Sequence, residues 1–310
     1  MAGVLHRVTP LKVPEVTPKL DYLEGHIGDF DTVFIGSSRI YHGVSPKVFD
    51  ATTGAAGRGT HSFNLAVNDM LPPESLRMLG TLLEMRPPRL RTVFLEAASA
   101  APAPDMGNLT VRDFYFEDWE SLGYGWKRAA QDLQEGKGWE TAWGDLAASA
   151  GTVARNELNL GRLDLTAYVT RTANRQGAVM LGQDRDGYLG EDHPLTEGSR
   201  VTLMRNLEAM RTGQVAERAR DRLNEEIYED ARESLARRGV ELVLVAAPST
   251  LRDYHAWVDA PAGARLLRFD DPEAHPELYA PEHRLDSDHL NDAGARIFTR
   301  ELAEAYLAGK

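Results

Sequence analysis

The sequence contains no cysteine. This absence excludes a thiol nucleophile, thiolate-bound zinc, an iron–sulfur cluster and disulfide bonds. It does not identify the compartment, because reducing and oxidising compartments both tolerate a chain without cysteine. Any covalent catalysis therefore has to use another nucleophile.

Long apolar runs are also missing. The first thirty residues hold no stretch of signal-peptide or membrane-spanning length. The run at 240–248 is interrupted by Glu241 and predicts a buried strand. We expect a soluble, cytoplasmic protein with no membrane segment in this chain. An extracytoplasmic role stays open if the sequence belongs to a longer, anchored protein.

Positive charge is scarce, because 35 basic residues face 47 acidic ones and the formal net charge is −12. Such a chain is a poor candidate for binding nucleic acid or an anionic membrane through its overall field. The charge does not argue against a neutral substrate such as an ester. Hydrophobic residues make up 42% of the chain, enough for a sizeable core.

Short β-branched and apolar runs alternate with helical patterns along the chain. This alternation predicts a mostly parallel sheet of about five strands with helices on both faces, a three-layer α/β/α sandwich. The expected strands cover residues 31–36, 61–67, 92–98, 241–248 and 265–270. The expected helices that cover them are at residues 73–85, 214–238 and 292–307.

Residues 99–239, between the third and fourth strands, are too many for a crossover loop. They predict a helical insertion, with helices around 118–134 and 139–158 and a surface loop at 183–197. Residues 1–30 are rich in proline and charge and predict an extended lead-in, with a short helix near residues 20–26. We expect one domain over 1–310. The insertion contains four tryptophans, Trp119, Trp126, Trp139 and Trp143. We expect most of them to pack between helices, and the alternative is that they form a lid or a substrate groove over the site.

A serine follows the first expected strand, in Gly36-Ser37-Ser38-Arg39. In open parallel sheets, ligands bind beyond the carboxyl ends of the strands. A serine at a glycine-assisted turn there can present its hydroxyl to a substrate and its own N–H to a developing oxyanion. The same residues also suit an ordinary turn that caps a helix.

A second polar block precedes the last helix, at residues 285–294. A serine hydroxyl is inert at neutral pH without a base, and His289 can supply one. Asp286, three residues earlier, can fix the imidazole tautomer and stabilise the imidazolium. Asp288 is the rival partner, although adjacent side chains usually diverge. Asn291 and Asp292 also suit a helix cap, and both roles can hold together.

These blocks resemble the SGNH/GDSL hydrolase superfamily, and most closely its subgroup with Gly-Ser-Ser-Arg in place of Gly-Asp-Ser-Leu. That subgroup includes esterases and polysaccharide O-acetyltransferase-like proteins. The resemblance covers residues 31–98 and 240–307, and the insertion carries no motif. The matching elements are Asp31-Thr-Val-Phe-Ile-Gly-Ser-Ser-Arg39, Val44-Ser-Pro46, Ser62-Phe-Asn-Leu-Ala66 and Asp286-x-x-His-Leu-Asn-x-x-Gly294.

The resemblance implies a flavodoxin-like SGNH fold and a triad of Ser38, His289 and Asp286 that works without a cofactor. It implies an acyl-enzyme formed from a small-molecule or carbohydrate ester and released to water or a sugar hydroxyl. The alternative is a catalytically weak or inactive member that binds a carbohydrate or a partner. The oligomeric state is not indicated.

The resemblance also implies an oxyanion hole, and there this sequence departs from the pattern. The family uses the nucleophile's N–H, a glycine N–H after the second strand and an asparagine after the third. Here Asn68 stands where the glycine is expected, and Glu96-Ala-Ala-Ser99 holds no asparagine. We expect the Ser38 N–H and the Asn68 side chain to serve as donors. One lost donor typically costs about 3 kcal/mol of transition-state stabilisation, which motivates the non-catalytic alternative.

Two neighbours of Ser38 are candidate substrate contacts. His42 shares a helix face with Ser38 and is a rival base or a substrate contact, ranked after His289. Arg39 can bind an anionic substrate group or pair with Glu96 or another acid, and a structural salt bridge is the favoured role.

A metal site is the remaining alternative. Histidine and aspartate side chains of the block before the last helix could bind a metal ion together with side chains at the ends of other strands. The spacing of these residues along the chain, however, matches no metal-ligand motif. We therefore expect no metal. The side chains concerned are His283, Asp286, Asp288 and His289, with His61 and Asp69.

Overall fold

The computed structural model describes residues 13–98, 111–116, 118–136, 138–158, 179–212, 222–250 and 260–309. The chain divides into two compact units. One comprises Met1–Pro18 with Ala101–Gly177, and the other comprises Lys19–Ala100 with Ala178–Lys310. The second unit contains the sheet and the candidate site.

The sheet has five strands, all parallel, in the order β2-β1-β3-β4-β5. This arrangement confirms the predicted fold class, because each of the five expected strands forms. Their bounds are β1 Thr32–Ile35, β2 Ser62–Asn64, β3 Thr92–Glu96, β4 Glu241–Ala246 and β5 Arg265–Arg268.

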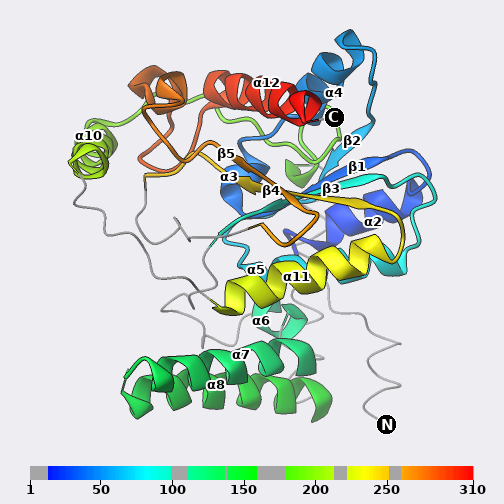
Figure 1. Ribbon diagram of the computed structural model, residues 1–310, viewed down its shortest axis with the longest axis vertical. Coiled ribbons are helices and arrows are strands. Elements are labelled where there is room, and N and C mark those ends of the chain that lie inside the picture. The colour runs from blue at the N-terminus through cyan, green and yellow to red at the C-terminus, as the bar shows by residue number, and fades with distance from the viewer. Residues whose placement is uncertain are drawn as a thin grey trace. The chain divides into compact units, whose positions relative to one another are not determined.

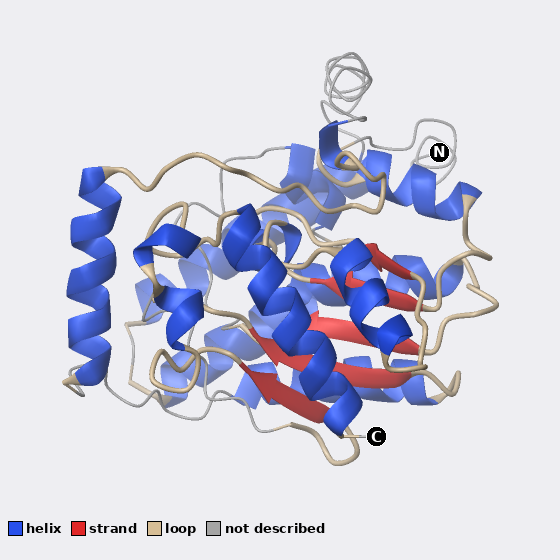
Figure 2. Cartoon of the chain, turned by 90° about the horizontal axis from the view of Figure 1, so that it is seen from above, coloured by secondary structure: helices blue, strands red, loops and turns tan. Residues whose placement is uncertain are grey.

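Helices cover both faces of the sheet (Figure 1). On one face lie α4 (Pro46–Ala55) and α12 (Asp292–Ala308), and on the other α5 (Pro72–Glu84) and α11 (Arg222–Ala236). The view from above shows α12 running over the strands (Figure 2). The predicted helices α5, α11 and α12 are confirmed, although residues 214–221 of the expected helix 214–238 lie outside the described residues.

Aromatic side chains fill the core between the sheet and the α4–α12 layer. Phe34 stacks on Phe94 at a centroid distance of 4.8 Å, and Phe49 meets Phe34 edge-on at 5.0 Å. Phe298 and Tyr306 bring α12 into the same cluster. Burying one such side chain contributes about 2 kcal/mol, so this layer fixes α12, the helix that follows the second polar block.

The opposite face is covered by aliphatic side chains at helical spacing. The predicted apolar stripe of α11 is buried as expected at Leu223, Ile227, Ala231 and Leu235. On α5, Leu79 and Leu82 are buried in the same way. These two layers enclose β1 to β4, which are buried along most of their length, whereas the edge strand β5 is only partly buried.

The segment at 179–196 belongs to the sheet unit, and α10 (Glu197–Arg211) follows it. The predicted insertion at 99–239 therefore extends over both units. The expected loop at 183–197 has no regular structure up to α10, yet it is fastened to β2, since Asn64 N donates to Asp186 O over 2.8 Å. Gly187 has φ 85°, and a Cβ there would lie 2.0 Å from Asn64 O, so only glycine fits.

The helices expected at 118–134 and 139–158 are confirmed as α7 (Trp119–Gln134) and α8 (Trp139–Leu158), which pack on each other, with α6 (Val111–Phe116) beside α8. The packing role predicted for most of the tryptophans holds for one pair, because Trp126 and Trp143 meet edge-on between α7 and α8 with their ring centroids 5.1 Å apart, whereas Trp119 and Trp139 are mostly exposed. The exposed fractions are 66% for Trp119, 57% for Trp126, 67% for Trp139 and 39% for Trp143.

The remaining elements are short. The lead-in contains α2 (Thr17–Gly25), near the short helix expected there, and residues 1–12 lie outside the described residues. Two turns of 3₁₀ helix, η2 (Pro276–Tyr279) and η3 (Pro281–His283), precede α12. Across the described part of the chain, every helix is too short or too polar to span a bilayer.

Candidate active site

Ser38 lies beyond the carboxyl end of β1, an inner strand between β2 and β3, where it begins the short helix α3 (Ser38–Tyr41). Gly36 makes this turn possible. A Cβ at Gly36 would lie 2.7 Å from both the Cβ of Glu96 and the Cγ1 of Ile40. The preceding Ser37 caps α3, since its hydroxyl accepts from Arg39 N. Gly36 and Ser37 therefore form a turn that caps a helix and at the same time leave Ser38 exposed to the pocket.

The second polar block folds into a tight loop between η3 and α12. Arg284 and Leu290 form an antiparallel bridge across it, and Leu285 N donates to His289 O over 3.0 Å. Asn291 caps α12 by accepting from Gly294 N at 2.9 Å. The cap thus fixes the C-terminal end of the loop.

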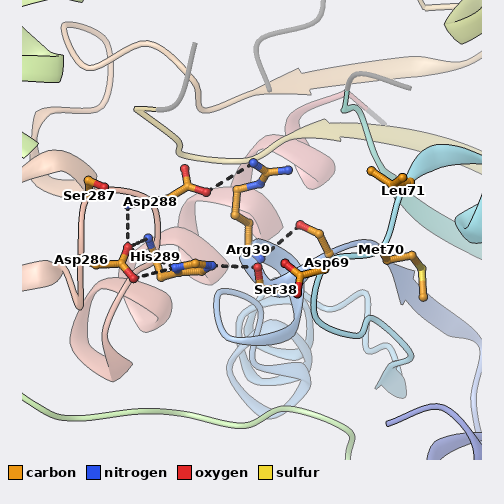
Figure 3. Close-up of a pocket in the computed structure, with 10 residues that line it drawn as sticks. Ser38, Arg39, Asp69, Met70, Leu71, Asp286, Ser287, Asp288 and His289 are labelled. Carbon is orange, nitrogen blue, oxygen red and sulfur yellow. Dashed lines mark hydrogen bonds and ion pairs between the residues drawn. The ribbon is translucent and has the colours of Figure 1, made fainter. Parts of the chain in front are cut away.

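Three side chains from the two blocks meet in a line (Figure 3). The Ser38 Oγ lies 2.8 Å from the Nε2 of His289. On the other side of the ring, the Nδ1 of His289 lies 2.9 Å from Oδ2 of Asp286 and 3.1 Å from its Oδ1. This order allows the Ser38 hydroxyl to donate to His289 while the Nδ1–H of His289 donates to Asp286.

The electrostatics of the Asp286–His289 pair favour an ionised carboxylate. Burial works to raise the pKa of Asp286, but the hydrogen bond and charge of His289 lower it well below its usual range. The backbone N–H groups of Asp288 and His289 also donate to Asp286 Oδ1, over 2.7 and 2.8 Å. Burial lowers the pKa of His289, yet the hydrogen bond and charge of Asp286 outweigh it and raise that pKa above its ordinary value.

A pocket of about 350 Å³ opens in front of this line. Residues from both polar blocks form its wall, and the loop after β2 closes it on another side (Figure 3). The lining residues are Ser37, Ser38, Arg39, Asp69, Met70, Leu71, Asp286, Ser287, Asp288 and His289.

Arg39 forms the predicted ion pair with Glu96, with 2.7 Å between Nε and Oε1. Its Nη1 also lies 3.5 Å from Oδ2 of Asp288. Asp288 therefore faces Arg39, and it accepts from the hydroxyl of Ser249 as well, rather than acting as a rival partner of His289. Because two carboxylates match its charge, Arg39 is poorly suited to binding an anionic substrate group.

His42 lies at the end of α3, and only 8% of it is exposed. Its Nδ1 is 2.8 Å from Leu189 O, and its Nε2 is 3.0 Å from Oδ1 of Asn68. Both ring nitrogens are thus engaged, which disfavours His42 as a rival base. The structure brings Asn68 beside α3 but does not include it in the pocket lining.

Two supporting residues were not singled out from the sequence. Asn64, inside the Ser-Phe-Asn-Leu-Ala block, donates from Nδ2 to Ile40 O and Val44 O, each over 2.8 Å, and so holds the end of α3. Arg284 is fully buried and donates to Ser287 O over 2.9 Å, which supports the loop of His289. The motif around Asn64 could have indicated its role, whereas Arg284 has no local signal.

The alternative metal site does not assemble. The Nδ1 of His61 bonds to Asp29 O over 2.7 Å, and the Nδ1 of His283 bonds to Glu277 O over 2.7 Å. Within the described ranges, no group of three or more His, Asp or Glu side chains is arranged to hold a metal ion.

The chain matches no protein-family model and no curated protein closely enough to be assigned to a family.

Proposed function

We propose that this protein is a serine-dependent acyl-ester hydrolase or O-acyltransferase of the SGNH type, acting through an acyl-enzyme. The observation that carries the proposal is the contact of 2.8 Å between Ser38 Oγ and His289 Nε2, with Asp286 on the far nitrogen. These groups come from opposite ends of the chain and converge in a pocket at the carboxyl edge of a parallel sheet.

In the acylation step, His289 Nε2 takes the proton of Ser38 as Oγ attacks the ester carbonyl carbon. The new C–O bond produces a tetrahedral intermediate, and the carbonyl electron pair moves to its oxygen. Collapse breaks the bond to the leaving alkoxide, which receives the proton from His289. Asp286 keeps the imidazole oriented and stabilises its charged form throughout.

In the second step a water molecule, or a sugar hydroxyl in a transferase, enters the place of the departed alcohol. His289 Nε2 takes a proton from the acceptor as the acceptor oxygen attacks the acyl carbon and forms a second tetrahedral intermediate. Collapse of this intermediate breaks the bond between the acyl carbon and Ser38 Oγ, and Oγ takes the proton back from His289. The acid product or the new ester leaves. Hydrolase and transferase differ only in the acceptor, so the pocket supports both.

The backbone N–H of Ser38 is a suitable oxyanion donor. It is the first amide of α3 and has no intrahelical acceptor, and no bond from it is found within the described residues. An oxyanion formed on the Ser38 ester lies next to this N–H.

The decisive experiment combines a fluorophosphonate probe with hydrolysis of 4-nitrophenyl acetate. The parent protein should be labelled on Ser38 and should turn over the ester, and Ser38→Ala should lose both. A Ser234→Ala variant is the matched control, because Ser234 lies on α11 outside the pocket lining; it should keep its labelling and its hydrolysis. Equal hydrolysis by the parent and Ser38→Ala would overturn the proposal.

A non-catalytic binding protein is the second candidate. It is favoured by one observation: Glu96, the last residue of β3, just before the place where the SGNH pattern has an asparagine donor, is bound to Arg39 and to Ser37 N. A parent that is neither labelled nor active would support this candidate. Faster release of the acyl group on addition of a sugar acceptor would favour transferase over hydrolase.

A further inference from the structure

Arg39 and Asp288 form an ion pair that joins the two polar blocks beside the proposed triad. Arg39 directly follows Ser38 in the sequence, and Asp288 directly precedes His289. Figure 3 shows the guanidinium of Arg39 directed at Asp288, and the Nη1 of Arg39 lies 3.5 Å from Oδ2 of Asp288. The two side chains are only 4% and 10% exposed, so salt screens their attraction less than that of a surface pair.

The Arg39 end of the pair is held by Glu96, the last residue of β3. The Oε1 of Glu96 lies 2.7 Å from Nε of Arg39, and its Oε2 accepts the N–H of Ser37 over 2.5 Å. The Glu96 side chain is buried. One carboxylate therefore binds the residue before Ser38 and the residue after it, which fixes the guanidinium relative to the nucleophile.

The Asp288 end of the pair is held by the segment that follows β4. Asp288 accepts from the hydroxyl of Ser249, which is buried. The neighbouring hydroxyl of Thr250 donates to the carbonyl of Ser287. The loop that carries the base is therefore attached to the end of β4 as well as to Arg39.

An ion pair built in this way provides geometry more than stability. Burying charged groups costs free energy that their attraction repays only in part, so a buried ion pair is weak evidence of stabilisation. The pair does fix the separation of two segments that come from opposite ends of the chain. These are the segments on which Ser38 Oγ and His289 Nε2 meet at 2.8 Å.

We infer that Arg39 and Asp288 are positioning residues, whose ion pair holds the nucleophile within reach of the base. Neither residue makes or breaks a bond in the reaction, and each acts through its neighbour in the chain. This inference rests on the proposed function. It gives a role to a buried ion pair that the acyl transfer itself does not use.

The two charges of the pair also act on the base, with opposite signs. Burial lowers the pKa of His289, whereas the hydrogen bond and charge of Asp286 raise it; Asp288 raises this pKa further, and Arg39 lowers it. The ring of His42, at the end of α3, faces His289 edge-on at a centroid distance of 6.3 Å. Removing either member of the pair should therefore leave its own mark on the pH profile.

The first test measures kcat and KM separately with 4-nitrophenyl acetate. Asp288→Asn keeps the shape of the side chain and an acceptor for the Ser249 hydroxyl but loses the ion pair. It should lower kcat roughly tenfold with KM changed less than about twofold, because a misplaced reacting group slows the chemical step. Asp184→Asn is the matched control, because Asp184 forms an exposed pair with Lys47, and it should leave both constants unchanged.

The second test removes the other member of the pair. Arg39→Met should lower kcat by roughly 10²-fold, since Glu96 and Asp288 both lose their partner. Arg39→Lys keeps the charge and should recover part of this loss. Arg211→Met is the control, because it removes an exposed arginine paired with Glu208. Urea unfolding of each variant shows whether the fold persists.

The pH–rate profiles separate positioning beside His289 from a general loosening of the fold. The acid limb should move to lower pH in Asp288→Asn and to higher pH in Arg39→Met, because the two changes remove charges of opposite sign. In the double variant Arg39→Met/Asp288→Asn the limb should return toward its place in the parent. The kcat of the double variant should be no lower than that of Arg39→Met alone, because the pair acts as one unit.

Three results would overturn the inference while Ser38 of the parent is still labelled by the fluorophosphonate. They are the parent's kcat in Asp288→Asn, effects that multiply in the double variant, and acid limbs that do not move apart in the two single variants. A parent that is not labelled would instead overturn the proposed function.

Discussion

At the scale of single residues, the site depends on how Asp286 is held. One carboxylate accepts the Nδ1–H of His289 and two backbone N–H groups of its own loop. These bonds keep its pKa well below the usual range despite burial, so the carboxylate is ionised at neutral pH. Its charge in turn raises the pKa of the His289 ring.

Replacing Asp286 by asparagine should therefore lower kcat on 4-nitrophenyl acetate by roughly 10³–10⁴-fold, because an amide neither fixes the tautomer nor stabilises the imidazolium. Steady-state kinetics check the loss. Glu304→Gln, an exposed carboxylate on α12, is the control and should match the parent. An Asp286→Asn variant within tenfold of the parent would contradict the triad.

The pH dependence follows from the raised pKa of His289. The ring acts as a base only when neutral, so activity should fall as pH drops through that pKa, and the acid limb should lie above the ordinary histidine value of about 6.5. The Asp286→Asn variant lacks the negative charge that raises the pKa of His289, so the acid limb of its residual activity should move to lower pH. A pH–rate profile of both proteins measures the shift, and a limb that stays in place would count against the pairing.

At the scale of elements, buried polar side chains stabilise segments that are too short to be stable by themselves. Helix α3 spans only Ser38–Tyr41, and Asn64 binds the carbonyls at its end. Lys19, which is fully buried, donates to the carbonyls of Asn64, Ala66 and Gly187 and lies 3.7 Å above the ring of Tyr41. It joins the segment after residue 179 to the end of β2.

Lys19→Met should destabilise the protein by about 2–4 kcal/mol, because buried carbonyls lose their donor. Lys47→Met is the matched control. Lys47 forms an exposed pair with Asp184 over 2.9 Å, and its removal should change the free energy of unfolding by less than about 0.5 kcal/mol. Urea denaturation measures the free energy of unfolding of both variants. Equal changes in this free energy would show that Lys19 does not join the two segments.

At the scale of the whole molecule, the acidic character of the chain continues into the pocket. Asp69 and Asp286 line it, whereas the charge of Arg39 is already matched by Glu96 and Asp288. The net charge of −12 adds a repulsive field of the same sign. Neutral esters therefore suit the site better than anionic ones.

We expect kcat/KM for the anionic 4-nitrophenyl hemisuccinate to be roughly tenfold below that for the neutral acetate at low ionic strength. Salt should narrow the gap, since the screening length falls to about 10 Å at 0.1 M. Asp69→Asn should narrow it as well, because Asp69 lines the pocket. A faster reaction of the anionic ester at low salt would show that the pocket charge does not select substrates.

The sequence by itself determined the elements and the two chemical blocks. Alternating apolar runs predict the five strands and three of the helices that cover them, α5, α11 and α12, although α4 was not predicted, and local spacing puts Asp286 within reach of His289. Gly36-Ser37-Ser38 marks the turn after β1 because close packing against β3 admits only glycine at position 36.

Only the tertiary structure decided the contacts between distant segments. No local pattern predicts that Leu189 binds His42, that Lys19 reaches Gly187, or that Asp288 turns to Arg39. Trp119 and Trp139, which are mostly exposed on α7 and α8, depart from the predicted packing role for a related reason: the periodicity of apolar residues identifies a helix face but not what covers it. Hydrogen bonds of buried polar groups are satisfied wherever the packed chain brings a partner, and that choice is made by the fold as a whole.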